Sequence, residues 1–148
     1  LRKGERDLFN GIYRHSVDTK GRMAIPAKFR SELGDVFFVT VGLDSCLYIF
    51  SQPEWEKFNT AIRSTLSFTA AEKLSRFFNA YSFEVEPDVQ GRVIIPTELR
   101  KRAGIGKQAV VIGASNHAEI WEPSKWDEAQ QSISDDDIRE LLEQINYI

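Results

Sequence analysis

Two arginines of the 148-residue chain, Arg22 and Arg92, occupy matching settings. Each follows an aspartate by four residues, Asp18 or Asp88, and stands directly after a glycine. This pattern is typical of a tight turn, because the carboxylate accepts hydrogen bonds from nearby backbone N–H groups and the glycine adopts a positive φ. Such a turn does not require a long cation. A guanidinium held on a turn can make bidentate contacts with a phosphate or with guanine O6 and N7, so the pattern indicates nucleic-acid binding.

Basic side chains gather around the first of these turns. Residues 14–32 hold five basic and two acidic side chains, a net charge of +3, whereas residues 84–102 hold four of each. Arg14, Lys20 and Lys28 have no basic counterpart in the second copy. Clustered Lys and Arg provide affinity for phosphate, so we expect the first copy to be the stronger phosphate surface. The net charge of the whole chain is −3, with much of the acid in residues 135–143.

Other chemistries find little support in the sequence. His15 and His117 are the only histidines, and neither belongs to a cluster of His, Cys, Asp or Glu at metal-ligand spacing. Lys107 lacks the earlier glycine of a phosphate-binding loop. Cys46 and His117 occupy equivalent positions in the two halves, so we expect packing roles for them rather than a nucleophile and its base. We therefore expect no enzymatic activity, no metal and no cofactor.

The aromatic residues are spaced as core residues. Trp55 and Trp126 occur at equivalent positions of two expected helices, which favours core anchors over platforms on which bases stack. The phenylalanines that we expect in the core are Phe9, Phe29, Phe37, Phe38, Phe50, Phe58, Phe77 and Phe78.

The two turns lie within a duplicated unit. Residues 18–30 match residues 88–100 without a gap at Asp, Gly, Arg, Ile, Pro and the final Arg. Residues 42–50 then align with residues 113–121 after a one-residue insertion, so the duplication covers most of a structural unit.

Each unit predicts the same order of elements. A strand, a turn and a short strand are followed by a short helix and a hairpin. The expected strands are residues 12–17, 23–25, 36–41 and 47–50 in the first unit and 81–85, 93–95, 109–112 and 118–121 in the second. Pro26 and Pro96 have a fixed φ suited to the first position of the short helices, which should end near Gly34 and Gly104.

Further helices are expected outside the duplicated strands. Residues 54–66 and 70–78 have helical apolar spacing, with Ser67 and Thr69 as cap residues between them. Another helix should begin at Pro123, and a last one after Ser134, where acidic residues in the first turn favour the helix dipole.

Two Gly-Arg-x-x-Ile-Pro strings, beginning at Gly21 and Gly91, accompany the paired Asp-x-x-x-Arg turns and a Phe9-Asn10-Gly11 opening. With this arrangement, from about Phe9 to Trp126, the chain resembles the MraZ family of bacterial regulators of the division and cell-wall gene cluster, in the wider AbrB-like DNA-binding superfamily. The resemblance implies an α+β, β-rich fold in which tandem repeats form a pseudo-dimeric AbrB-like β-barrel with peripheral helices. The expected parts are a first repeat with its following helix at 9–66, a linking helix at 67–79, a second repeat at 80–132 and a C-terminal helix at 133–148.

The same resemblance implies a function and a site. Members bind direct repeats in double-stranded promoter DNA as ring-shaped homo-oligomers, and exposed apolar helices such as 54–66 are candidates for the subunit contacts. The positions that match the family's DNA-binding residues are Lys20, Arg22 and Arg92, and the charge pattern adds Arg14 and Lys28. Asp18, Gly21, Asp88 and Gly91 are assigned to the turns. Because Gln90 replaces the lysine found at Lys20, we expect the first turn to provide most of the DNA contact.

Two alternatives stay open at this point. One is an antitoxin-like DNA-binding protein whose C-terminal part neutralises a toxin partner, although the periodic, capped sequence up to Ile148 speaks against a disordered tail. The other is a structural ring with no role on nucleic acid. No apolar stretch approaches the roughly 20 residues that span a bilayer, and a lone cysteine suits a reducing compartment. We therefore expect a cytoplasmic, nucleoid-associated protein with no membrane contact and no small-molecule substrate.

Overall fold

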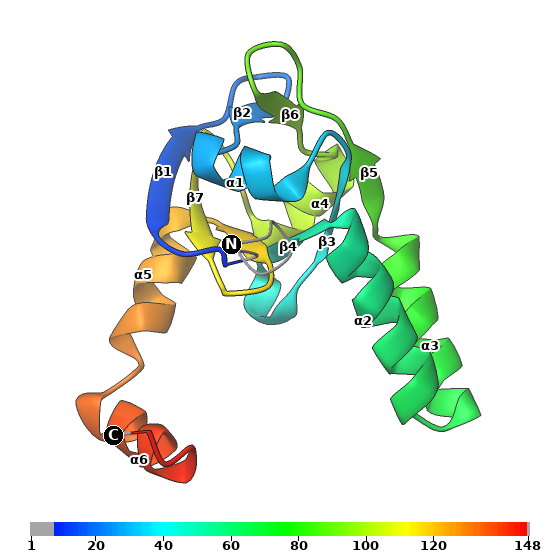
Figure 1. The fold of residues 1–148 in the computed structure, drawn as a ribbon. Coiled ribbons are helices and arrows are strands. Elements are labelled where there is room, and N and C mark those ends of the chain that lie inside the picture. Colours follow the sequence, from blue (N-terminus) through cyan, green and yellow to red (C-terminus); the bar gives the residue numbers. More distant parts are fainter. Residues whose placement is uncertain (1–7, 148) are drawn as a thin grey trace.

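The computed structural model describes residues 8–147. In this part of the chain eight strands form two antiparallel sheets that surround the core as a small barrel (Figure 1). The larger sheet has the strand order β1 (Ile12–Ser16), β7 (Gln108–Gly113), β8 (Ala118–Trp121), β4 (Leu47–Ser51), β3 (Phe37–Val41) and β5 (Phe83–Val85). The smaller sheet is a two-stranded ribbon of β2 (Arg22–Ala24) and β6 (Arg92–Ile94).

The two halves of the chain exchange strands. β1 of the first half pairs with β7 of the second, and β5 of the second half pairs with β3 of the first. Between these exchanged pairs, β2 lies against its counterpart β6, and β4 lies against its counterpart β8. The halves are thus related by an approximate two-fold axis and share one barrel, which confirms the pseudo-dimeric, β-rich α+β fold expected from the sequence.

Apolar side chains from both halves meet inside the barrel. Phe29 of α1 (Ala27–Leu33) and Leu99 of α4 (Thr97–Ala103) are fully buried. Met23 and Val93, the central residues of the two ribbon strands, are buried as well. Because successive side chains of a strand point to opposite faces, the burial of these two residues turns their neighbours toward the outside of the ribbon.

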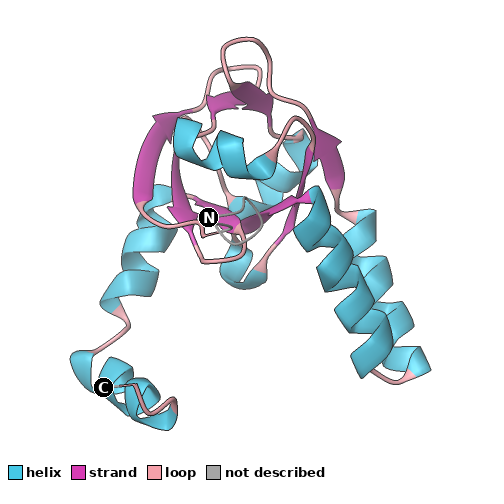
Figure 2. Ribbon diagram, viewed as in Figure 1, coloured by secondary structure: helices cyan, strands magenta, loops and turns pink. Residues whose placement is uncertain are grey.

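Two pairs of helices extend from the barrel on opposite sides (Figure 2). α2 (Gln52–Thr65) and α3 (Phe68–Ala80) pack together as a hairpin. On the other side α5 (Pro123–Gln131) leads to α6 (Asp135–Gln144), which lies away from the barrel and buries none of its residues (Figure 1). None of the helices within residues 8–147 combines the length and the apolar composition needed to cross a membrane.

Polar side chains cap α3 and α6 at predicted positions, but Thr69, also expected as a cap residue, lies inside α3. The Ser67 hydroxyl accepts a hydrogen bond from the Ala70 N–H at the start of α3. Ser134 accepts from the Asp137 N–H at 3.0 Å, and the Asp137 carboxylate accepts in return from the Ser134 N–H at 3.0 Å. This reciprocal pair is a capping box, which confirms the predicted start of the last helix.

The prolines of the repeat lie one position earlier than predicted. Pro26 and Pro96 precede α1 and α4 with ψ angles of 133° and 140°, in an extended conformation. Each residue must continue the direction of the ribbon strand before it, while its carbonyl accepts the first hydrogen bonds of the helix. The Pro26 carbonyl, for example, accepts from the Phe29 N–H at 2.8 Å.

Several aromatic residues are less buried than the sequence suggests: Phe38 and Phe58 are only partly buried against the core, and Phe77 and Trp126 differ more from expectation. Phe77 is 41% exposed, because Phe78 and Ala71 occupy the side of α3 that faces the protein. Trp126 is only half-buried against Trp121, at 5.4 Å between ring centroids, whereas its counterpart Trp55 is buried.

Candidate nucleic-acid interface

The first turn is closed by the side chain of Asp18. Its Oδ1 atom accepts hydrogen bonds from the backbone N–H groups of Lys20 and Arg22, both at 2.9 Å. Its Oδ2 atom accepts from Arg22 Nε at 2.7 Å. Gly21 has a φ of +82°, and its N–H donates to the Asp18 carbonyl at 2.9 Å. The Asp18 carboxylate therefore holds both the backbone of the turn and the Nε end of the Arg22 guanidinium.

The second turn repeats this geometry. The Asp88 carboxylate accepts from the N–H groups of Gln90 and Arg92 at 2.9 Å and 3.0 Å, and from Arg92 Nε at 3.1 Å. Gly91 has a φ of +78°. Two sequences that differ at the intervening positions thus build the same turn.

These hydrogen bonds favour the ionised aspartates. The backbone N–H of Arg22 is the main cause that lowers the pKa of Asp18, and the arginine side chain adds to this effect. The backbone N–H of Arg92 lowers the pKa of Asp88 in the same way. Each turn is therefore a fixed ion pair over the physiological pH range.

The arginines keep free hydrogen-bond donors. The side chains of Arg22 and Arg92 are 32% and 33% exposed. Among residues 8–147, only their Nε atoms have a side-chain partner, so the terminal Nη1 and Nη2 groups have none. These groups form the planar end of the guanidinium that binds phosphates and guanine edges.

The ribbon places both arginines on one surface. Arg22 lies opposite Ile94 and Arg92 lies opposite Ala24 in the β2–β6 register. Since the central residues of both strands are buried, Arg22 and Arg92 share the outer face of the ribbon. Figure 1 shows the ribbon and both turns together at one end of the molecule. We refer to this surface, residues 18–24 and 88–94, as the ribbon face.

The five predicted DNA-binding residues divide between two locations. Lys20, Arg22 and Arg92 belong to the ribbon face, and Lys20 is exposed on its turn. Arg14 lies on β1 and forms an exposed ion pair with Asp127 of α5 at 3.3 Å. Lys28 lies on α1, where its ammonium group donates to the side-chain carbonyl of Asn10. Arg14 and Lys28 therefore lie on other elements than the ribbon, and each has a side-chain partner of its own.

Two apolar residues of the ribbon face were not identified from the sequence. Val89 is fully exposed in the second turn, and Ile94 is 58% exposed on β6. Their counterparts in the first copy are Thr19 and Ala24. This difference could have been found by aligning the two copies. It makes the part of the ribbon face from the second copy more apolar and less basic than the part from the first copy.

Within the part of the chain that the structure describes, no group of three His, Cys, Asp or Glu residues could hold a metal ion. Burial raises the pKa of the Cys46 thiol, so this cysteine is a poor nucleophile. Burial alone would raise the pKa of Glu119, but hydrogen bonds from His117 and Trp121, both at 2.9 Å, lower it.

Comparison with known proteins places the chain in a family. The family model described as "MraZ protein, putative antitoxin-like" matches it twice, over residues 8–79 and 77–144. The protein named transcriptional regulator MraZ from Acetivibrio thermocellus is 44% identical over 139 residues, which cover 91% of this chain and 96% of that protein. The protein of the same name from Natranaerobius thermophilus is 46% identical over 125 residues, covering 84% and 87% of the two chains. The duplicated turn, the strand-exchanged barrel and these matches agree, and the chain belongs to the MraZ family.

Proposed function

We propose that this protein is a transcriptional regulator that binds double-stranded promoter DNA through the ribbon face. The observation that carries the proposal is the pair of Asp-x-x-x-Arg turns, each of which holds its guanidinium through Nε and leaves the planar end free. The relatives described above are named transcriptional regulators. Their name and the geometry of the turns support the same role.

The two turns would make unequal contributions to binding. Lys20 and Arg22 provide two cations on the first turn, whereas Gln90 and Arg92 provide one on the second. Phosphate contacts set affinity and orientation, and guanidinium contacts with guanine edges add sequence preference. We propose that the targets are direct repeats in the promoter of the division and cell-wall gene cluster, bound in the nucleoid of the cytoplasm.

A salt titration of DNA binding tests the proposed site. We expect Arg22→Ala to weaken binding by about 1–3 kcal/mol and to reduce the slope of log affinity against log salt by about one unit. Arg92→Ala should have a smaller effect. Lys57→Ala is the control, since it removes an exposed cation from α2, outside the ribbon face. Full affinity in Arg22→Ala would contradict the site.

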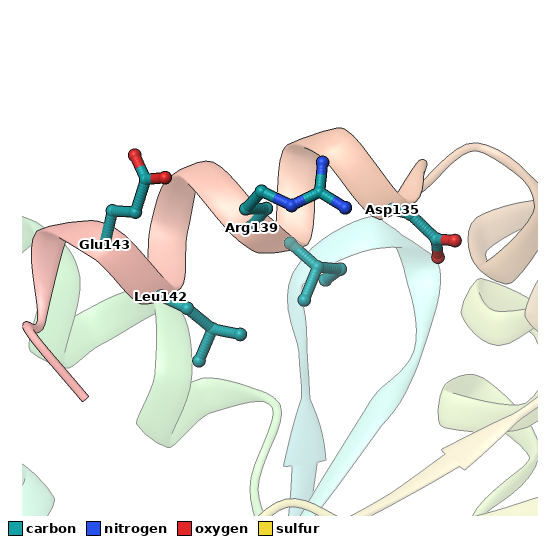
Figure 3. Close-up of a pocket in the computed structure, with 5 residues that line it drawn as sticks. Asp135, Arg139, Leu142 and Glu143 are labelled. Atoms are coloured by element: carbon teal, nitrogen blue, oxygen red, sulfur yellow. The ribbon is translucent and has the colours of Figure 1, made fainter. Parts of the chain in front are cut away.

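We also propose that several chains assemble into a ring, and two exposed surfaces support this. α6 and its C-cap residue present an apolar surface, in which Ile138, Leu141 and the C-cap Ile145 are each at least 44% exposed. The helix also carries five acidic residues and one arginine. Figure 3 shows Leu142 and the Glu143 carboxylate on opposite sides of this helix. Such a helix is amphipathic and acidic, without a partner in its own barrel.

The tip of the α2–α3 hairpin fits this helix. Leu66 and Phe68 are exposed there beside a groove of about 380 Å³ that is also lined by Arg63. Lys73 and Arg76 of α3 are exposed on the same hairpin. Trp55 and Ile62 of α2 are buried within the chain, so the apolar surface of the predicted 54–66 segment lies at its end, at Leu66. The contact of a ring would therefore join α6 of one copy to the hairpin tip of the next.

Light scattering of the purified protein tests this assembly. The wild type should have the mass of a closed oligomer, and Leu141→Lys should reduce that mass, because an ammonium cannot enter an apolar contact without a large desolvation cost. Gln144→Lys, at the exposed end of the same helix, is the matched control and should keep the wild-type mass. A monomeric wild type would contradict the ring.

A further inference from the structure

Two arginines that repeat in the sequence lie outside the proposed DNA contacts. Arg30 is on α1 and Arg100 is on α4, at the last matching position of each repeat motif. Both side chains are only partly exposed, and each points to the half of the molecule that does not contain it.

The guanidinium of Arg100 covers the first turn. A Cβ atom placed on Gly21 would lie 2.7 Å from both Cζ and Nε of Arg100. This spacing leaves no room for a methyl group, so the planar guanidinium packs directly against the glycine backbone. Arg30 covers the second turn equivalently, since a Cβ atom on Gly91 would lie 2.5 Å from its Cζ and Nη1.

Hydrogen bonds hold Arg100 in this position. Its Nε donates to the Ile95 carbonyl at 2.9 Å, and its Nη2 donates to the Thr97 hydroxyl at 3.0 Å. The Ile95 N–H in turn donates to the Gly21 carbonyl at 2.9 Å. Arg100, Ile95 and Gly21 therefore form one connected unit that joins the second half of the chain to the first turn.

The equivalent unit around Arg30 is less complete. The Ile25 N–H donates to the Gly91 carbonyl at 3.1 Å, as its counterpart does. Arg30 Nε, however, is buried without a hydrogen-bond partner among the described residues. Ala27 occupies the position of Thr97, so the hydroxyl that binds Arg100 has no equivalent here.

We propose that Arg100 and Arg30 are positioning residues for DNA binding and that each acts on the turn of the opposite repeat. Arg100 fixes the Asp18–Arg22 turn, and Arg30 fixes the Asp88–Arg92 turn. The planar guanidinium packs against the backbone of the glycine, and the aspartate of the same turn accepts hydrogen bonds from its backbone N–H groups. Together these contacts limit the motion of the turn. This proposal rests on the proposed function only for its effect on DNA; the effect on the turns is independent of it.

Double-mutant cycles on DNA affinity test the crossed pattern. We expect Arg100→Ala to weaken binding about tenfold in the wild-type background, a typical coupling for residues in contact. The same change should have a clearly smaller further effect in Arg22→Ala, whose first turn presents only Lys20 to DNA, and its full effect in Arg92→Ala. Arg30→Ala should show the reverse pattern. Equal effects of Arg100→Ala in both backgrounds would mean that Arg100 contacts DNA itself and would overturn the proposal.

Arg100→Lys separates positioning from charge. Lysine keeps the positive charge but has no planar group to pack against Gly21. We therefore expect Arg100→Lys to bind DNA nearly as weakly as Arg100→Ala. Wild-type affinity in the lysine variant would assign Arg100 a purely electrostatic role and would contradict the proposal.

Amide hydrogen exchange without DNA gives a readout that does not depend on the proposed function. In Arg100→Ala the Gly21 N–H, which donates to the Asp18 carbonyl, should exchange faster, while the Gly91 N–H should be unchanged. Faster exchange throughout residues 8–147 would indicate general loss of structure and would overturn a specific positioning role. If Arg22→Ala binds DNA normally, the proposed function fails, and the exchange experiment still decides the role of Arg100.

Discussion

The carboxylate of Asp18 accepts three hydrogen bonds within one turn, two from the backbone and one from Arg22. Asp88 does the same in the second repeat. An asparagine could accept some of these bonds but carries no charge to pair with the guanidinium. The aspartate therefore links the shape of the turn to the orientation of the arginine.

This linkage predicts how stability depends on pH. The pKa of both carboxyls is lowered from the ordinary value of 3.8, chiefly by backbone N–H groups of Arg22 and Arg92. A lowered folded-state pKa contributes stability that is present above pH 3.8 and is lost as the pH falls through the folded-state value. Asp18→Asn should therefore reduce the free energy of unfolding more at pH 7 than at pH 3, as measured by urea denaturation. An equal reduction at the two pH values would contradict this interpretation.

Glycine substitutions separate backbone strain from packing. Gly21 and Gly34 have nearly equal φ angles, +82° and +83°, but only Gly21 has the guanidinium of Arg100 against it. Gly34→Ala should cost about 1–3 kcal/mol for backbone strain alone, because its φ of +83° and ψ of −170° are adopted almost only by glycine. Gly21→Ala should cost about 1–3 kcal/mol more, because the methyl group also displaces Arg100. Urea denaturation measures both, and equal losses would show that Arg100 moves aside freely.

The sequence predicts the two Asp-x-x-x-Arg turns but not the arginines, Arg100 and Arg30, that pack against them. Asp18 and Gly21 belong to a local pattern, so their conformation follows from residues within one turn. The contact of Arg100 with Gly21 joins residues far apart in the chain, and it depends on which strands pair. The ion pair of Arg14 with Asp127 of α5 also joins residues far apart in the chain, and no local pattern indicates it.

At the scale of elements, most strands and helices lie within two residues of their predicted bounds. Hydrophobic period, prolines and cap residues are local signals, and they identified both the ribbon strands and the capped α6. Pairing partners are not local signals. The alternation of residues 12–17 predicts a strand but does not say that β1 pairs with β7 rather than with its neighbour β2.

The two related tryptophans should differ in their contribution to stability. Trp55 is buried, with ring centroids of Phe38, Phe50 and Phe58 at 5.5, 5.7 and 5.9 Å. Trp55→Ala should cost about 3–5 kcal/mol, as expected for the loss of a buried aromatic residue. Trp126→Ala should cost clearly less, because Trp126 is half-buried and its aromatic neighbour is Trp121. Thermal or urea unfolding of the two variants measures the difference, and equal losses would contradict the assigned packing.

At the scale of the whole molecule, the strand exchange makes the two repeats interdependent. A fragment of residues 8–80 keeps β1 but loses its partner β7, and it keeps β3 but loses β5. We expect this fragment to be either unfolded or a homodimer in which a second copy replaces the missing strands. Circular dichroism combined with light scattering distinguishes these states. A folded monomer of residues 8–80 would contradict the shared barrel.

The sequence predicts that α6 forms but does not predict where it lies relative to the barrel. Its period and its capping box predict a helix correctly. The surface that covers its apolar side does not belong to the same barrel, since Ile138 and Leu141 remain exposed there. Only the arrangement of residues 8–147 shows that α6 packs against no other element of this part of the chain.

The rigidity of the β2–β6 ribbon has a consequence for the proposed binding of DNA. Three consecutive residue pairs tie β2 to β6, and Met23 and Val93 anchor both strands in the core. The paired strands therefore fix the distance between the backbones of Arg22 and Arg92. In the proposed complex, the ribbon of a single chain would not widen to follow a bent or overwound duplex. Adjustment to helical pitch would then come from the DNA or from rotation between neighbouring chains of the proposed ring, and the ring as a whole would set the spacing of the repeats that it binds.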